Sequence, residues 1–77
     1  GACMTAGRIG ILHKNESGML SHFTTILGNA GINIDGMANK SNGDYAYALI
    51  DVDTNVPEDV LAKLEQTDGV LKVRKVK

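Results

Sequence analysis

Residues 31–53, GINIDGMANKSNGDYAYALIDVD, decide the fold of this chain because they contain two extended segments around a tight turn. Asn42-Gly43 is a strong hairpin signal, since both central positions of a type I′ turn need a positive φ. We therefore predict a strand at 32–40 and an antiparallel return strand at 45–53. Along the return strand, small or apolar residues alternate with larger or polar ones, which predicts one face packed closely against a helix.

An amphipathic helix is predicted on each side of this hairpin. Residues 19–30 place apolar side chains at helical spacing, and Gly31 follows as a common C-terminal stop. Residues 57–68 begin with a proline and two acidic residues, which suit the first turn of a helix. Gly28 either weakens the first helix by up to about 1 kcal/mol relative to alanine or lets another element pack closely.

Two more strands, at 8–13 and 70–76, complete the order β-α-β-β-α-β. With right-handed crossovers, this order predicts an α+β fold, a ferredoxin-like βαββαβ sandwich. The four-stranded antiparallel sheet would have both helices on one face, with the first and third strands central and the second and fourth at the edges. Tyr45 and Tyr47 would then lie on the other, open face.

The chain of 77 residues allows one domain, which we place at 8–77. Residues 1–7 are small and aperiodic and read as a flexible leader or linker, which favours an excised domain over a free-standing protein. The single Cys3 excludes an internal disulfide framework. A core of this size is marginal, so oligomerisation is the expected source of further stability. The edge of the second strand offers a symmetric pairing surface for a homodimer.

Composition argues against several other functions. Eight Lys and Arg balance nine Asp and Glu, so no strong field attracts nucleic acid. An RNA-binding sandwich needs aromatic residues on its central strands and a basic surface, whereas here both tyrosines share one strand and no basic patch is evident. No metal-ligand spacing or nucleotide fingerprint occurs, so neither a metal nor a cofactor is expected. No apolar run approaches the roughly 20 residues of a membrane span, and a cytoplasmic location without a membrane partner is expected.

The turn after the first strand carries the residues best suited to a small ligand. Backbone N–H groups near Gly18 and Met19, at the start of a helix, favour a carboxylate. Asn15 offers both a donor and an acceptor, and His13 can play either role. Together these groups could form a cradle for a small ligand. We assign no catalytic residue, because the proximity of His13 and Ser17 in sequence does not establish the geometry of a triad.

Residues 10–20, GILHKNESGML, followed by 31–34, GINI, resemble ACT domains. More closely, the chain is similar to the C-terminal regulatory domains of D-3-phosphoglycerate dehydrogenases. Matches around 39–47 and 69–74 extend the resemblance to residues 8–77. It implies a βαββαβ module without catalysis of its own, in which a homodimer forms through a strand edge. It further implies that a small amino acid, L-serine being favoured, regulates a dehydrogenase of serine biosynthesis by binding at the dimer interface.

The ligand contacts that the resemblance implies are His13 and Asn15 from one chain and Asn33 from the second strand of the neighbouring subunit. One position departs from the family pattern, since Ser17 replaces a proline that would fix φ in advance. That change is expected to loosen the loop and to affect affinity more than the existence of the site.

Each of these side chains also has a purely structural interpretation. His13 can bond a backbone carbonyl at the end of its strand, Asn15 can cap the helix, and Asn33 can be an outward-facing strand residue. The alternative function is therefore a structural dimerisation module that binds no ligand.

Overall fold

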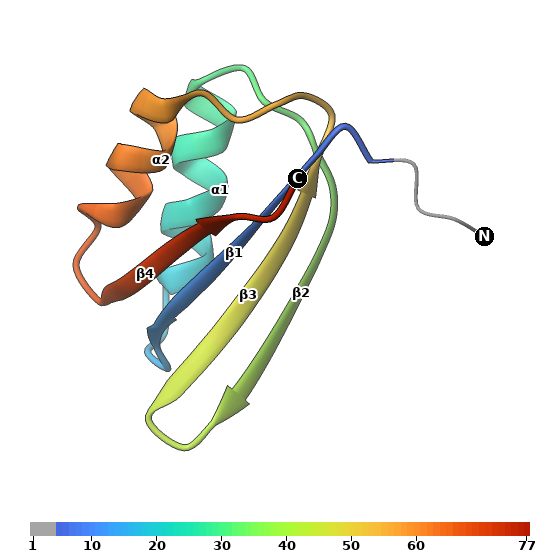
Figure 1. Cartoon of the computed structure of the whole chain (residues 1–77). Helices are drawn as coiled ribbons and strands as arrows, with labels where there is room; N and C mark the ends of the chain where they lie inside the picture. The colour runs from blue at the N-terminus through green and yellow to red at the C-terminus, as the bar shows by residue number, and fades with distance from the viewer. Residues whose placement is uncertain (1–4) are drawn as a thin grey trace.

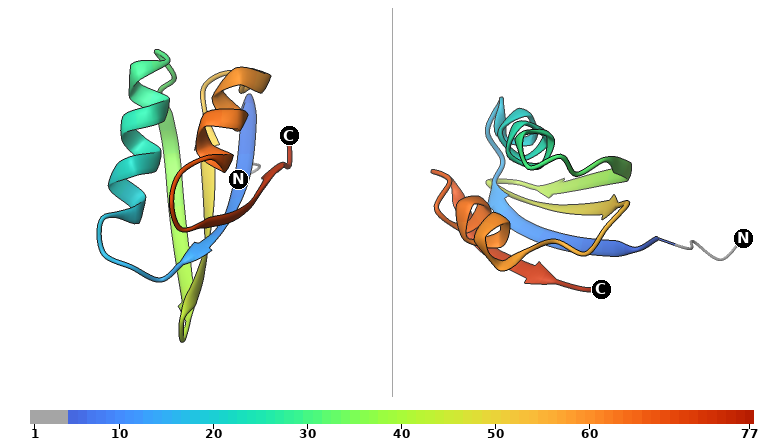
Figure 2. Two further views of the ribbon diagram at one scale, coloured as in Figure 1. Left: turned by 90° about the vertical axis from the view of Figure 1, so that its left-hand side faces the viewer. Right: turned by 90° about the horizontal axis from the view of Figure 1, so that it is seen from above.

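The computed structural model of the chain describes residues 5–77, so Cys3 and the rest of residues 1–4 of the predicted leader lie outside the described residues. The helices and strands of these residues, labelled in Figure 1, are β1 (Gly7–Lys14), α1 (Met19–Asn29), β2 (Ile34–Asn42), β3 (Tyr45–Val52), α2 (Glu58–Glu65) and β4 (Val70–Lys75). The strands form one antiparallel sheet in the order β2-β3-β1-β4. Both helices cover the same face of this sheet, as Figure 2 shows. The predicted ferredoxin-like βαββαβ sandwich is confirmed, with β1 and β3 central and β2 and β4 at the edges.

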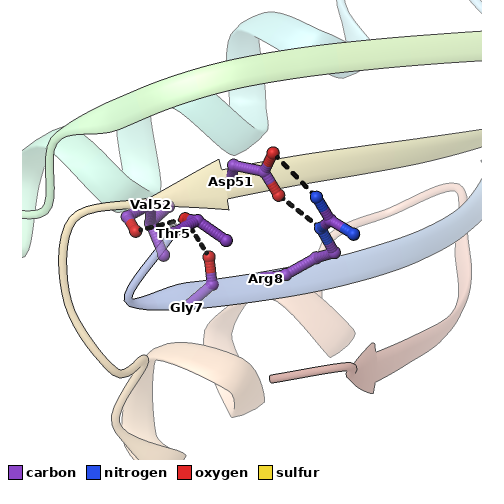
Figure 3. A network of polar contacts seen from close by, with 5 residues as sticks. All are labelled: Thr5, Gly7, Arg8, Asp51 and Val52. Carbon is purple, nitrogen blue, oxygen red and sulfur yellow. Dashed lines mark hydrogen bonds and ion pairs between the residues drawn. The ribbon is translucent and has the colours of Figure 1, made fainter. Parts of the chain in front are cut away.

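The N-terminal end of β1 is tied to the end of β3. β1 begins at Gly7, one residue before the predicted start, and Thr5 is buried at 6% exposure although it falls in the predicted leader. The Thr5 hydroxyl lies 2.9 Å from the carbonyl oxygens of both Gly7 and Val52, as Figure 3 shows. Thr5 is therefore packed against the sheet.

The hairpin between β2 and β3 forms at the predicted place but with a different turn. Asn42 pairs directly with Tyr45, which leaves Gly43 and Asp44 as the two-residue loop. Of these two loop residues, only Gly43 has a positive φ, 71°. A positive φ at the first central position alone is the pattern of a type II′ turn. The prediction of a type I′ turn centred on Asn42 and Gly43 is therefore wrong, because the two-residue loop lies one residue further along the chain.

The end of α1 is fixed by its backbone and by two apolar side chains. Gly31, with φ of 75°, donates to the Gly28 carbonyl oxygen at 3.0 Å, and Ile32 donates to the Leu27 carbonyl oxygen at 3.0 Å. This pair of bonds is a Schellman motif, which satisfies carbonyl groups that the helix itself leaves unpaired. Leu27 and Ile32 are both buried in the core beside it. Gly31 thus ends the helix, as predicted.

The core lies between the helices and the inner face of the two central strands. Burial alternates along β3 as predicted, with Ala46, Ala48, Ile50 and Val52 buried. One cluster connects the sheet with both helices, and its buried members are Ile9, Ile11, Met19, Phe23, Leu27, Ile32, Ala48, Ile50, Val52, Val56, Val60, Leu61 and Leu64.

Gly28 of α1 offers a test of how that helix is stabilised. A β-carbon at position 28 would meet no atom within 4 Å, so close packing does not explain the glycine. We expect Gly28→Ala to raise the free energy of unfolding by about 0.5–1 kcal/mol, because alanine loses less conformational freedom in a helix. Urea unfolding followed by circular dichroism measures the change.

Gly31→Ala is the matched control. Its β-carbon would also enter open space, but the residue has a φ of 75°. Alanine there is expected to lower stability by about 1 kcal/mol or more, since a side chain is strained in the left-handed region. Changes of the same sign in both variants would contradict this account.

Candidate functional site

His13 lies at the end of β1 with its side chain on the helix-covered face, where it is 2% exposed. Its ring meets Phe23 of α1 edge-on, with the ring centroids 5.1 Å apart. Nδ1 lies 2.8 Å from the carbonyl oxygen of Lys14, and Nε2 lies 2.9 Å from Oδ1 of Asn39. Both ring nitrogens therefore have partners within the chain, including the backbone carbonyl that the structural interpretation predicts.

The contact between His13 and Asn39 crosses β3. On β3, His13 is paired with Ala46. Asn39 of β2 is paired with Ala48, which is the next residue of β3 on the same face. The two alanines leave space above β3 through which the imidazole reaches the edge strand. Because a carbonyl oxygen only accepts, Nδ1 donates to Lys14. Nε2 then donates to Oδ1 of Asn39 if the ring is charged; if the ring is neutral, the Asn39 amide is flipped so that its nitrogen donates to Nε2.

Asn15 connects the loop after β1 to the β2–β3 hairpin. Its Nδ2 donates to the Gly43 carbonyl oxygen at 3.0 Å, and its backbone N–H donates to the Asp44 carbonyl oxygen at 2.8 Å. Its Oδ1 accepts no hydrogen bond within residues 5–77. The side chain does not cap α1, so that interpretation of Asn15 is not what the structure shows.

A cleft of about 330 Å³ opens where this loop meets the hairpin. It contains a cation, two carboxylates, an amide and a phenol, which together could contact both charged groups of a zwitterion. Its lining residues are Lys14, Asn15, Glu16, Asp44 and Tyr45.

The start of α1 faces the same loop. Gly18 adopts a left-handed conformation with φ of 85° directly before the helix, and no side chain caps the helix start. Its first backbone N–H groups therefore have no intrahelical partners and suit an anion. Met19 can contribute only its backbone there, because its side chain is 4% exposed and packs against Gly69.

Asn33 lies at the opposite end of the sheet from the β2–β3 hairpin, to which Asn15 is bonded. It precedes β2, where its backbone N–H donates to Oδ1 of Asp53 and its Nδ2 lies 3.3 Å from Oδ1 of Asp35. From there β2 runs about 25 Å to the hairpin, at roughly 3.3 Å per residue. Within one chain, His13, Asn15, Gly18 and Met19 thus lie near the loop between β1 and α1, although only Asn15 of them lines the cleft, and Asn33 lies apart from them.

The sequence pattern of the ACT domain family matches residues 7–69. The chain belongs to the ACT domain family. ACT domains are regulatory, non-catalytic modules that typically bind amino acids and dimerise.

Two kinds of relative agree with this assignment. A D-3-phosphoglycerate dehydrogenase of Haemophilus influenzae is 30% identical over 63 residues, which are 82% of this chain and 15% of the relative. The crystal structure of the ACT domain from GTP pyrophosphokinase of Chlorobium tepidum matches with a TM-score of 0.73 at 18% identity, over 91% of this chain and 95% of that chain. A homoserine dehydrogenase from Thiobacillus denitrificans matches with a TM-score of 0.69 at 28% identity, over 94% of this chain and 17% of that chain.

Sequence reasoning missed the residues that hold this ACT domain's loop in place. Asn39 and Asp44 are distant from His13 and Asn15 in the sequence and meet them only through the sheet. A polar residue opposite an inward-facing alanine of the next strand was the available signal for Asn39.

Within residues 5–77, no three His, Cys, Asp or Glu side chains gather as a metal site. No helix of this described part is long and apolar enough to cross a bilayer.

Proposed function

We propose that this ACT domain is the amino-acid-sensing regulatory module of a dehydrogenase of serine biosynthesis, and that its ligand is L-serine. The ligand is bound between two copies of the chain that join along their β2 edges. The observation that carries the proposal is the bond between Asn15 and Gly43, because it holds the candidate loop beside the end of the edge strand. The parent enzyme is suggested by the relative that is a D-3-phosphoglycerate dehydrogenase.

Two-fold symmetry explains how Asn33 reaches the other site residues. Two sheets that continue into each other with their helices on the same side are related by an axis perpendicular to the sheet, so the two β2 strands run antiparallel. The beginning of one β2 then lies beside the end of the other. Asn33 of a second copy therefore approaches the hairpin to which Asn15 is bonded.

The exposed side chains of β2 support this mode of association. Met37, near the middle of β2, pairs with the buried Ile50 and so lies on the helix-covered face. It is nevertheless 44% exposed. Antiparallel pairing about the strand centre brings the two Met37 side chains close together and removes this apolar surface from water.

Each part of a zwitterion has a candidate partner at such an interface. The carboxylate suits the uncapped start of α1, and the ammonium suits Oδ1 of Asn15 and the amide oxygen of Asn33 from the second copy. Asn39 is exposed, so its amide can turn away from Nε2 of His13 and let the ligand hydroxyl take its place. With about 1.5 kcal/mol as the ceiling for each of its roughly seven heavy atoms, the binding free energy of serine cannot exceed about 10 kcal/mol. A micromolar dissociation constant, about 8 kcal/mol, is the expectation within that limit.

The alternative, a structural dimerisation module without a ligand, is favoured by one observation. His13 is buried and has both ring nitrogens hydrogen-bonded within the chain. In that case the ring only supports the sheet and the helix, and the β2 edge pairs without any small molecule.

Titration with L-serine separates the two functions. We expect backbone amide resonances of Asn15, Gly18, Met19 and Asn33 to shift on adding L-serine, because these groups contact the ligand or adjoin it. At about 100 times its dissociation constant the ligand should raise the free energy of unfolding by roughly 2.7 kcal/mol. Nuclear magnetic resonance and thermal unfolding measure the two effects.

Glycine and D-serine are the controls for this titration, since one lacks the hydroxyl and the other reverses its position. Absence of any shift at millimolar L-serine, in a chain that sediments as a dimer, would support the structural alternative. A monomeric mass at high micromolar concentration, with or without serine, would contradict both functions.

A further inference from the structure

The surface of the sheet that no helix covers, which we call the open face, is defined by the strand register (Figure 2). Residues directly opposite each other on neighbouring strands share a face, so the paired positions of the open face form four rows. The rows are Asn42, Tyr45 and Lys14; then Lys40, Tyr47, Leu12 and Lys72; then Ala38, Leu49, Gly10 and Arg74; then Gly36, Asp51 and Arg8. Apolar or aromatic residues occupy the centre of this grid. The cations lie around it, with Lys40 on the β2 edge, Lys72 and Arg74 on the β4 edge, and Arg8 and Lys14 at the two ends of β1.

Charge is distributed very unevenly between the open face and the rest of the chain. Five of the eight Lys and Arg residues occupy paired positions on this face, against one of the nine acidic residues, Asp51. Arg8 forms an ion pair with Asp51, which Figure 3 shows. The other four cations form no ion pair within residues 5–77. The paired positions of the open face therefore carry an excess of cations although the net charge of the chain is −1, and the nearest further carboxylates are those of Glu16 and Asp44, which line the cleft beside Lys14 and Tyr45.

Two tyrosines on the central strand β3 lie among these cations. Tyr45 and Tyr47 are 50% and 37% exposed. Two steps along a strand separate them by about 7 Å. The Tyr47 ring lies across Gly10, since a β-carbon at position 10 would clash with the tyrosine hydroxyl. A hollow of about 270 Å³ lies beside this ring and is lined by Ala38, Lys40, Tyr47 and Leu49.

We propose that the open face binds single-stranded nucleic acid. A single strand presents a flat ring and a phosphate at every step, so its bases stack on exposed aromatic side chains while cations neutralise the phosphates. Four-stranded sheets that bind RNA use aromatic residues of their central strands in this way. An acidic protein surface would match the charge as well, but it gives no reason for two exposed rings side by side among the cations.

This proposal differs from the expectation that nucleic acid is not a partner, which rested on the balanced charge, on the lack of an evident basic patch and on both tyrosines sharing one strand. The cations are spread over residues 8–74, and only the strand register collects them on one face. The open face shares only Lys14 and Tyr45 with the cleft proposed for the amino acid. Pairing along the β2 edge extends the sheet sideways and leaves the open face of each copy uncovered.

Binding of a fluorescein-labelled uridylate 12-mer to the 77-residue chain tests the proposal. We expect saturable anisotropy at 50 mM salt, and a dissociation constant about 50-fold higher at 200 mM salt if all four unpaired cations contact phosphates. Amide shifts should concentrate on β1, β3 and β4. A duplex RNA of the same length should bind more weakly, because its bases are not free to stack.

Substitutions on the two faces provide matched comparisons. Tyr45→Ala and Tyr47→Ala should each weaken binding about 5- to 150-fold, as loss of one stacked base predicts. Lys72→Glu should weaken it severalfold, whereas Lys63→Glu, the same charge change on α2, should change it less than twofold. Tyr45→Ala keeps the result interpretable if loss of the more buried Tyr47 ring disturbs the fold.

Several outcomes would overturn the proposal. One is no anisotropy change at 0.5 mM chain and 50 mM salt, and another is equal loss of binding in Lys72→Glu and Lys63→Glu. Equal affinity for duplex and single strand would reduce the effect to unspecific charge attraction. Binding to phosphatidylglycerol vesicles or to an acidic peptide without binding to the 12-mer would assign the open face to that other class of partner.

Discussion

Replacing His13 with alanine should lower the free energy of unfolding of the ligand-free chain by about 2–4 kcal/mol. The ring is 2% exposed and packs edge-on against Phe23, so its removal leaves a cavity between the sheet and α1. The Lys14 carbonyl and the Asn39 amide also lose the imidazole as a partner. A loss of this size is a large part of the stability of a small domain. Urea unfolding, with circular dichroism as the signal, measures it.

The second histidine of the chain is the control for this experiment. His22 is exposed on α1, so His22→Ala should change stability by less than about 0.5 kcal/mol. Similar small losses in both variants would mean that His13 does not support the fold. A large loss for His13 alone would also show that His13→Ala is a poor test of ligand binding, because it alters the protein before any ligand is added.

Mixing two inactive variants should restore serine binding, and this is the strongest test of a site shared between copies. Asn15→Ala and Asn33→Ala should each bind L-serine about 10- to 150-fold more weakly, through loss of one hydrogen bond to a charged group. In a hybrid dimer, one site combines both alanines, while the other combines both native asparagines. After exchange of subunits in an equimolar mixture, about a quarter of the sites should bind with native affinity. Isothermal titration calorimetry counts them.

Asn29→Ala, an exposed substitution at the end of α1, is the neutral control and should bind like the unmodified chain. Mixing it with either inactive variant should also recover native sites, since it supplies both asparagines. If the mixture of Asn15→Ala and Asn33→Ala recovers no sites while the controls do, both residues act within one chain. The shared site would then be wrong.

The fold was predictable because each local signal in the sequence agreed with the next. Alternation in β3, the hairpin at Gly43 and the stop at Gly31 are all properties of neighbouring residues, and together they leave one arrangement of the sheet. The turn type was not predictable from Asn42-Gly43 alone. Cross-strand pairing of Asn42 with Tyr45 decides which two residues form the loop, and that pairing depends on the register of the whole hairpin.

The candidate site was predictable only in part, for a related reason. The residues from His13 to Met19 are consecutive, so their proximity follows from the chain itself. The partners that hold them, Asn39 for His13 and the hairpin carbonyls for Asn15, come from β2 and its turn. Neither the burial of His13 nor the collection of cations on the open face follows from composition, because both depend on which strands become neighbours.

Gly10 has a negative φ and forms no turn, so its own backbone does not require glycine. Its lack of a side chain serves the residue on the next strand, whose ring occupies the space above it. In evolutionary terms, we therefore expect the residues at positions 10 and 47 to change together rather than independently. A lineage can gain a side chain at position 10 only by lifting the aromatic ring from the sheet or by giving it up, and either change alters the surface of the protein without touching its core.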